Sequence, residues 1–87
     1  MNWVKEYPYI AHRGLHSKDI VENSEKAFDN AVEKKFAIEL DIQFLSDGTP
    51  VVFHDSGLDR LLGLQVEINS LNPSFFKHLK YKDGQRL

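Results

Sequence analysis

Two apolar segments with strand character flank one amphipathic helical segment, and this order restricts the fold more than any other feature. The first apolar segment comprises residues 9–11, the helical pattern comprises residues 25–35, and the second apolar segment comprises residues 36–45. A strand, a crossover helix and a parallel strand form a βαβ unit, which is right-handed in nearly all proteins. The sequence therefore predicts an α/β fold, and periodicity alone leaves a barrel and an open sheet as alternatives.

A hairpin and a second helix are predicted after this unit. The turn residues 46–48 separate the segment 36–45 from a further apolar segment, residues 50–54, which indicates a β-hairpin. After a leucine-rich loop, Asn72 can cap a helix that has Pro73 at its first position, where a missing N–H costs nothing. Parallel sheets need cover on both faces, which the two or three predicted strands cannot provide by themselves.

The helical segment 25–35 has one apolar face, which is expected to pack on the sheet, and Asn23 or Ser24 is its expected N-cap. The residues predicted to be buried are Ala27, Phe28, Ala31, Val32, Phe75, Phe76 and Leu79. Three aromatic residues near the N-terminus are expected to pack on the fold rather than to bind a ligand, namely Trp3, Tyr7 and Tyr9.

The composition excludes several classes of function. With 11 Lys and Arg against 13 Asp and Glu, the net charge is −2 and the basic residues are scattered, so no nucleic-acid partner is expected. The absence of cysteine excludes disulfides and thiolate metal ligands. No apolar run reaches the length of a signal peptide or the ~20 residues of a membrane span. A small-molecule ligand, a cytoplasmic location and no stable membrane insertion are therefore expected.

Glu39 and Asp41 are two positions apart in the strand predicted for residues 36–45. In a continuous strand both carboxylates point to the same face, where a divalent cation such as Mg²⁺ or Ca²⁺ would relieve their repulsion. The alternative is that both lie on the solvent face of an amphipathic strand, because charged residues are mostly exposed. Asp55 is expected to cap a loop or support a neighbouring residue rather than to bind a metal.

His12 and His54 each stand at the end of a predicted strand, where catalytic groups often lie in α/β folds. Because histidine titrates near neutral pH, two histidines can supply a general acid and a general base. Arg13 could hold a phosphate oxygen through paired hydrogen bonds. Taken singly, these residues could equally be ordinary surface groups. His16 and His78 have no partner pattern and are expected to be surface or packing residues.

Five short motifs occur together, and their order and spacing are more specific than any one of them. The motifs are Ile10-Ala11-His12-Arg13-Gly14, Glu22-Asn23-Ser24, Ile38-Glu39-Leu40-Asp41-Ile42, Ser46-Asp47-Gly48 and Val51-Val52-Phe53-His54-Asp55, and Leu58-Asp59-Arg60 extends them. From Tyr9 onward, the sequence resembles the glycerophosphodiester phosphodiesterase family. Val21 and Ser24 stand where that family usually has proline and threonine, and neither position bears on the implied chemistry.

The resemblance implies a TIM (β/α)8 barrel with its active site at the C-terminal ends of the strands. A complete barrel has ~250 residues, so residues 1–87 are expected to be the N-terminal segment of a single domain. This segment would hold a βα unit, the hairpin and a further helix, and the barrel would be incomplete. The polypeptide is expected to continue past Leu87 with further βα units and another acidic metal ligand.

The resemblance also assigns roles to five residues. It implies that His12 and His54 are the catalytic acid and base, and that Arg13 binds the substrate phosphate. It implies that Glu39 and Asp41 bind a divalent cation, Mg²⁺ or Ca²⁺. The implied reaction is the metal-dependent hydrolysis of a glycerophosphodiester to glycerol 3-phosphate and an alcohol.

Two alternatives remain open from the sequence. The chain could be a non-catalytic remnant or an assembly module whose unfinished sheet pairs with a second copy, because exposed strand edges favour pairing. The full-length enzyme could instead act on a related phosphodiester such as a lysophospholipid, because the leaving-group pocket lies outside this segment. With every one of these alternatives, the isolated 87 residues are expected to be inactive.

Overall fold

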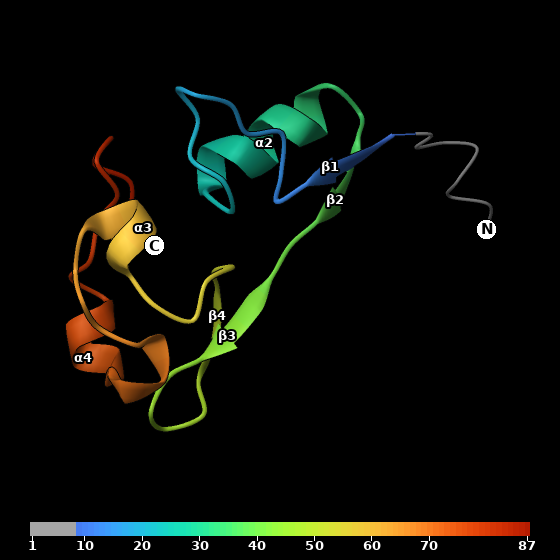
Figure 1. The fold of residues 1–87 in the computed structure, drawn as a ribbon. Helices are drawn as coiled ribbons and strands as arrows, with labels where there is room; N and C mark the ends of the chain where they lie inside the picture. The colour runs from blue at the N-terminus through green and yellow to red at the C-terminus, as the bar shows by residue number, and fades with distance from the viewer. Residues whose placement is uncertain (1–8) are drawn as a thin grey trace. The chain divides into compact units, whose positions relative to one another are not determined.

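The computed structural model describes residues 9–87, so the predictions for Trp3 and Tyr7 lie outside the described residues. The chain forms two compact units, residues 1–40 and residues 41–87. The described part of each unit includes a two-stranded sheet, with one helix in the first unit and short helical turns in the second, as Figure 1 shows. The structure is therefore a mixture of α and β elements, as predicted.

The first unit contains a parallel pair of strands connected by a helix. Strand β1 (Ile10–His12) pairs in parallel with β2 (Ala37–Glu39), and α2 (Glu25–Glu33) connects them and packs on β2. The register places His12 beside Glu39 at the ends of the two strands. The predicted succession of strand, helix and parallel strand is confirmed.

Helix α2 begins at one of the two predicted caps. Ser24 Oγ accepts a hydrogen bond from the backbone N–H of Ala27 at 3.2 Å and donates one to the carbonyl of Val21 at 2.6 Å. The helix ends at Glu33 rather than at residue 35, because Lys35 adopts a left-handed conformation with φ of 60°. The prediction was right about the start of the helix and wrong about its end.

The buried face of α2 is narrower than predicted. Ala27 and Ala31 are fully buried, Phe28 is half-buried, and Val32 is 65% exposed, so the prediction that Val32 is buried is wrong. Consecutive helical residues point about 100° apart. Because α2 packs through Ala27 and Ala31, the residue after Ala31, which is Val32, points towards solvent. The small alanine side chains also let the backbone at Gly14 approach the helix closely.

The second unit contains an antiparallel hairpin of β3 (Ile42–Phe44) and β4 (Pro50–Val52). The single strand predicted for residues 36–45 is wrong, because its two halves pair with different partners. The first half is β2, which pairs with β1 in parallel, and the second half is β3, which pairs with β4. Leu40 and Asp41 lie between the halves and outside both strands.

The hairpin turn is the one predicted at residues 46–48. Gly48 has a φ of 89°, a conformation that glycine adopts without steric cost. The strand predicted for residues 50–54 ends at Val52, so His54 lies in the bend that follows β4.

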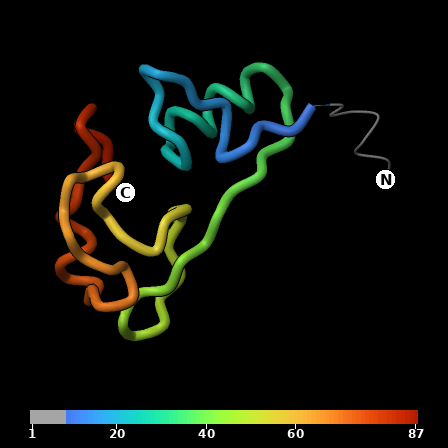
Figure 2. Tube along the Cα trace, in the orientation of Figure 1, coloured from blue at the N-terminus to red at the C-terminus, as the bar shows by residue number. Residues whose placement is uncertain are grey.

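After the hairpin, the second unit contains short helical turns joined by loops (Figure 2): α3 (Asp59–Leu62), the 3₁₀ turn η1 (Ile68–Ser70) and α4 (Pro73–Phe76). The predicted cap of α4 is confirmed, because Asn72 Oδ1 accepts from the N–H of Phe75 at 2.8 Å. The sequence did not predict α3 or η1, and neither has a side-chain cap. Within the described part of the chain, no helix is long and apolar enough to cross a membrane.

The core of the second unit comes mainly from residues that flank the hairpin and the helical turns, because α3 and α4 contain no buried residue. Its buried apolar residues are Leu45, Phe53, Leu58, Ile68, Leu71, Leu79 and Tyr81. The rings of Phe53 and Tyr81 stack with their centroids 6.4 Å apart. Leu79 is buried as predicted, but Phe75 is 49% exposed, so its predicted burial is wrong. One helical turn buries only part of its circumference, and α4 has four residues.

Candidate active site

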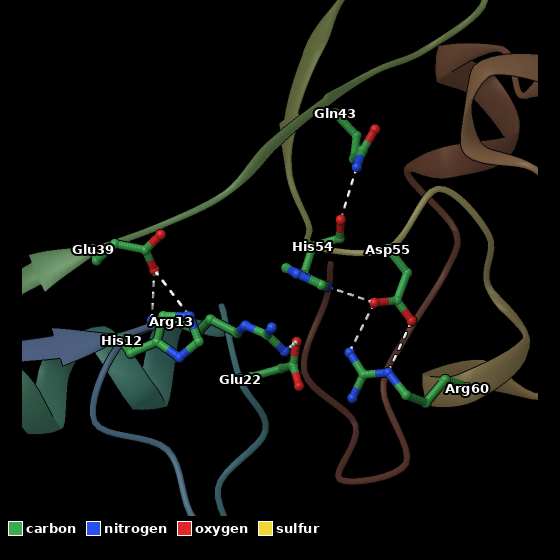
Figure 3. Close-up of polar contacts among 8 residues, drawn as sticks. All are labelled: His12, Arg13, Glu22, Glu39, Gln43, His54, Asp55 and Arg60. Atoms are coloured by element: carbon green, nitrogen blue, oxygen red, sulfur yellow. Dashed lines mark hydrogen bonds and ion pairs between the residues drawn. The ribbon is translucent and has the colours of Figure 1, made fainter.

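His12 and Glu39 meet at the ends of the parallel strands β1 and β2. Their backbone positions are register partners, and His12 Nε2 lies 3.9 Å from Glu39 Oε1 (Figure 3). This distance exceeds that of a hydrogen bond, so the contact is an ion pair only when His12 carries a proton. The side chains of His12 and Glu39 are 66% and 42% exposed, which leaves both groups accessible to a ligand.

The turn after β1 holds Glu39 through main-chain groups. Arg13 has a left-handed φ of 61°, and its backbone N–H donates to Glu39 Oε1 at 3.1 Å. The N–H of Gly14 donates to the Glu39 carbonyl at 3.3 Å. Gly14 has a φ of 77°, and a Cβ there would lie 2.8 Å from Ala27 Cβ and 2.9 Å from Phe28 Cδ1. Glycine alone avoids both the strain and the collision.

The Arg13 guanidinium forms a largely buried ion pair with Glu22. Arg13 Nη1 donates to Glu22 Oε2 at 2.9 Å, and the two side chains are 19% and 8% exposed. Asn23 adds a main-chain link, because its N–H donates to the Arg13 carbonyl at 2.7 Å. The predicted phosphate contact of Arg13 did not include a protein partner for its guanidinium. The only hint of this ion pair in the sequence is that Glu22, in the motif 22–24, is acidic.

His54 is held at its backbone and at its imidazole by two different side chains (Figure 3). Gln43 Nε2, from β3, donates to the His54 carbonyl at 2.7 Å. The imidazole Nδ1 lies 2.7 Å from Asp55 Oδ1, and the His54 side chain is 41% exposed. The imidazole is therefore oriented by a hydrogen bond while part of it stays accessible.

Arg60, in the first turn of α3, contacts both oxygens of the Asp55 carboxylate. Its Nε donates to Oδ2 at 2.8 Å and its Nη2 donates to Oδ1 at 3.0 Å. Hydrogen bonding from Arg60 is the main cause that lowers the pKa of Asp55 to about 2; the contact with His54 also lowers this pKa, and burial acts in the opposite direction. Because an ionised carboxylate only accepts hydrogen bonds, Nδ1 of His54 is the donor in their contact.

The contacts of Asp55 agree with the expectation that it supports a neighbouring residue. Arg60 and Gln43 were not identified as candidate site residues from the sequence. Arg60 follows Asp55 by five positions, and this spacing alone does not predict a contact between them. The contact forms because the chain turns into α3 between the two residues. His16 and His78 are exposed, as expected.

Glu39 and Asp41 supply the carboxylate oxygens that Mg²⁺ and Ca²⁺ prefer. Glu39 uses Oε1 for the N–H of Arg13, and a carboxylate with about four lone-pair sites keeps capacity for a cation. Asp41 is half-buried, and its carbonyl accepts from the N–H of Phe53 at 2.9 Å. Among residues 9–87, no group of three or more His, Asp or Glu is placed to hold a metal. The oxygen chemistry of each carboxylate suits a divalent cation. The same-face argument for a continuous strand does not hold, however, because β2 ends at Glu39 and Asp41 lies outside both strands.

The sequence matches a family of phosphodiesterases. The profile of the glycerophosphoryl diester phosphodiesterase family matches residues 12–87. The chain is 48% identical to glycerophosphodiester phosphodiesterase 1 of Rattus norvegicus over 74 residues, which cover 75% of this chain and 22% of that protein. It is 38% identical over 63 residues to a Mus musculus protein named lysophospholipase D, covering 71% of this chain and 19% of that protein.

The structure gives the same result. It superimposes with a TM-score of 0.77 on a crystal structure of glycerophosphodiester phosphodiesterase from Thermotoga maritima, with 39% identity over 91% of this chain and 34% of that one. The chain spans about a fifth of the length of the curated relatives it matches and about a third of this solved structure. The mixed α/β architecture agrees with the barrel fold that the sequence resemblance implied. The chain therefore belongs to the glycerophosphoryl diester phosphodiesterase family.

Proposed function

We propose that the full-length protein hydrolyses glycerophosphodiesters to glycerol 3-phosphate and an alcohol with the help of a divalent cation. Residues 1–87 would be the N-terminal segment of its single catalytic domain. The family match carries this proposal, because it begins at His12 and spans all five candidate residues. The parallel register that puts His12 beside Glu39 supports it, because both side chains stand at the ends of strands.

Glu39 and Asp41 would hold the divalent cation, Mg²⁺ or Ca²⁺, together with a further acidic residue from the rest of the full-length protein. A divalent cation at this position supplies positive charge that neutralises a phosphodiester. The hydrogen bond from the N–H of Arg13 to Glu39 Oε1 at 3.1 Å orients the Glu39 carboxylate before any ligand binds. Preorganisation of this kind lowers the cost of binding.

His12 and His54 would transfer protons in the reaction. One imidazole takes the proton of the attacking hydroxyl, which we propose to be the neighbouring glycerol hydroxyl of the substrate. The other imidazole gives a proton to the departing alcohol oxygen, which would otherwise leave as an unstable alkoxide near neutral pH. The side chains of His12 and His54 are 66% and 41% exposed, so both can reach a substrate.

Arg13 would contact a phosphate oxygen of the substrate. Its planar guanidinium suits the geometry of phosphate oxygens. Glu22 already holds Nη1 at 2.9 Å and is 8% exposed, so the guanidinium is fixed in place rather than mobile. A bound phosphate would share the guanidinium with Glu22.

Lysophospholipids are a second candidate substrate class. The observation that favours them is the 38% identity to the Mus musculus protein named lysophospholipase D. The match to glycerophosphodiester phosphodiesterase 1 of Rattus norvegicus is higher, at 48% over a longer segment, and favours small glycerophosphodiesters.

The release of products from glycerophosphocholine by the full-length protein tests the proposal. Glycerol 3-phosphate and choline are measured in EDTA and then with millimolar Mg²⁺ or Ca²⁺, beside parallel assays with lysophosphatidylcholine. We expect turnover at or above ~1 per second with metal and none in EDTA. His12→Ala and His54→Ala should each lower the rate by about 10²- to 10⁴-fold. The control His16→Ala removes an exposed histidine and should keep the full rate.

Three results would separate the alternatives. Turnover of lysophosphatidylcholine alone would select the second substrate class. Full activity in His12→Ala or His54→Ala would exclude that residue from proton transfer. The absence of metal-stimulated release from both substrates would contradict the proposed function.

A further inference from the structure

We propose that Asp55 and Arg60 are positioning residues for His54: Asp55 fixes the imidazole by accepting from Nδ1, and Arg60 fixes Asp55. This proposal rests on the proposed function, because it concerns the proton transfer assigned to His54. Neither Asp55 nor Arg60 would touch the substrate. Their effect would reach the reaction only through the orientation and tautomer of one imidazole.

The contacts form a chain of three side chains in which each group has a short hydrogen bond. His54 Nδ1 lies 2.7 Å from Asp55 Oδ1, and Arg60 donates to the two carboxylate oxygens at 2.8 Å and 3.0 Å. Two parallel bonds from a planar guanidinium fix the plane of the carboxylate as well as its position. Asp55 therefore cannot rotate away from His54 without breaking contacts to Arg60.

The backbone of His54 is restrained independently of its imidazole. Gln43 Nε2 donates to the His54 carbonyl at 2.7 Å, which ties the bend to β3. His54 is thus held at two places, because Gln43 binds its backbone carbonyl and Asp55 binds its imidazole. The side chain of Asp55 is 20% exposed, so water competes only weakly for its oxygens.

This arrangement selects one neutral tautomer of His54. Because the Asp55 carboxylate accepts from Nδ1, neutral His54 carries its proton on Nδ1 and presents an unprotonated Nε2. If His54 is the base, Nε2 forms a bond to the proton of the attacking hydroxyl as the O–H bond breaks; if it is the acid, protonated His54 gives its Nε2 proton to the departing oxygen as the N–H bond breaks. In either role, the carboxylate offsets the positive charge of the imidazolium.

His12 lacks an equivalent contact among the described residues. Its nearest ion-pair partner there is Glu39, which lies 3.9 Å from Nε2 rather than at hydrogen-bond distance from Nδ1. The positioning chain is therefore specific to His54. Substitutions in it should affect the function of His54 and leave that of His12 intact.

The test uses full-length protein with Asp55→Ala, Asp55→Asn, Arg60→Lys and the control Asp59→Asn. Asp59 is exposed and stands beside Arg60 in α3, so its substitution matches the charge change without touching His54. For each variant, kcat and KM are measured with glycerophosphocholine, the folded fraction is measured by thermal unfolding, and the tautomer of His54 is read from ¹⁵N NMR of labelled histidine. The tautomer is the readout that a purely structural role would not change.

We expect Asp55→Ala and Asp55→Asn to lower kcat by about 10²-fold with KM changed less than about 3-fold. His54 should lose the preference for a proton on Nδ1 in Asp55→Ala. Arg60→Lys keeps the charge but not the two parallel bonds, so kcat should fall by about 3- to 10-fold. Asp59→Asn should match the wild type in every measurement.

The proposal is overturned if His54 keeps its Nδ1 proton in Asp55→Ala and kcat changes only in proportion to the folded fraction. If Asp55→Ala does not fold, the same criterion applies to Asp55→Asn, which keeps the side-chain volume, and to Arg60→Lys. The parallel variant His54→Ala separates this failure from failure of the proposed function. An inactive His54→Ala with normal Asp55 variants overturns only the positioning role, whereas a fully active His54→Ala overturns both.

Discussion

The two units of the chain hold their histidines by different means. In the first unit, the surroundings of His12 are set by main-chain geometry, because the turn at Arg13 and Gly14 directs two backbone N–H groups to Glu39. In the second unit, the orientation of the His54 imidazole is fixed by a side chain, through its contact with Asp55. A group held by the backbone depends on conformation and packing, whereas a group held by side chains depends on individual charges.

This difference indicates which changes each region tolerates. The first region should be sensitive to any substitution that alters the left-handed turn, even one without charge. The second region should be sensitive to the loss of a single carboxylate or guanidinium, even one that leaves the backbone unchanged. The following predictions test this contrast, in order of decreasing effect.

The largest effect is expected when residues 1–87 are separated from the rest of the protein. The isolated segment should show no turnover of glycerophosphocholine above ~1 per second with millimolar Mg²⁺ or Ca²⁺. Its described residues contain no group of three metal-binding side chains, and catalysis needs a supporting shell held to about half an ångström. The control is His12→Ala in the same segment, which reports contaminating enzyme. Ordinary enzymic turnover that this substitution abolishes would contradict the expectation.

Removal of the proposed metal carboxylates should have the next largest effect. In the full-length protein, Glu39→Ala and Asp41→Ala should each lower the metal-stimulated rate by about 10³-fold, because each removes a charged oxygen donor. The measurement is the rate as a function of Mg²⁺ concentration. Glu33→Ala, an exposed glutamate at the end of α2, is the control and should keep the wild-type dependence. Wild-type metal dependence in the double variant would show that the assignment is wrong.

The main-chain turn can be broken without changing any charge. Gly14→Ala should lower the free energy of unfolding by about 2–4 kcal/mol, since φ is 77° and the new Cβ would collide with Ala27. Gly48→Ala is the matched control, because its φ is 89° but no atom lies within 4 Å of its Cβ position. Gly48→Ala should lower the free energy of unfolding by only about 1 kcal/mol. Denaturant unfolding of the full-length variants measures both values, and equal losses would argue against the close packing.

The smallest effect concerns the pH dependence of stability in the second region. The pKa of Asp55 is lowered to about 2 in the folded protein from its ordinary value of 3.8. A depressed pKa contributes stability that is present above the unfolded value and is lost as the pH falls through the folded value. Because Arg60 is 46% exposed, solvent screening limits the contribution to about 1 kcal/mol. Unfolding free energies between pH 4 and pH 2 should therefore fall less steeply in Asp55→Asn than in the wild type.

Much of the fold could be predicted because local patterns determine it. The apolar segments, the Ser24 cap and the turn at residues 46–48 all depend on nearby residues, and the structure confirms them. The division of the predicted strand 36–45 could not be read from its sequence. Its apolar pattern is continuous, and only pairing with different partners separates β2 from β3. The exposure of Val32 likewise depends on how closely α2 packs rather than on its periodicity.

The candidate site was predictable to the extent that it follows strand ends. His12 and Glu39 stand at the ends of β1 and β2, and the predicted parallel pairing brings them together, although their contact was not predicted. The partners Glu22 and Arg60 were not predicted, because a hydrogen bond between side chains depends on loop conformation. The left-handed residues after β1 and the bend after β4 determine those contacts. The spacing of residues in the sequence does not reveal the left-handed turn after β1 or the bend after β4.

The location of a bound cation tests the central claim most directly. Crystals of the full-length protein grown with Mn²⁺ in place of Mg²⁺ would locate the ion by its anomalous scattering. We expect one ion within about 2.0–2.6 Å of oxygen atoms from both Glu39 and Asp41. An ion bound elsewhere, or one that contacts only one of these two carboxylates, would contradict it.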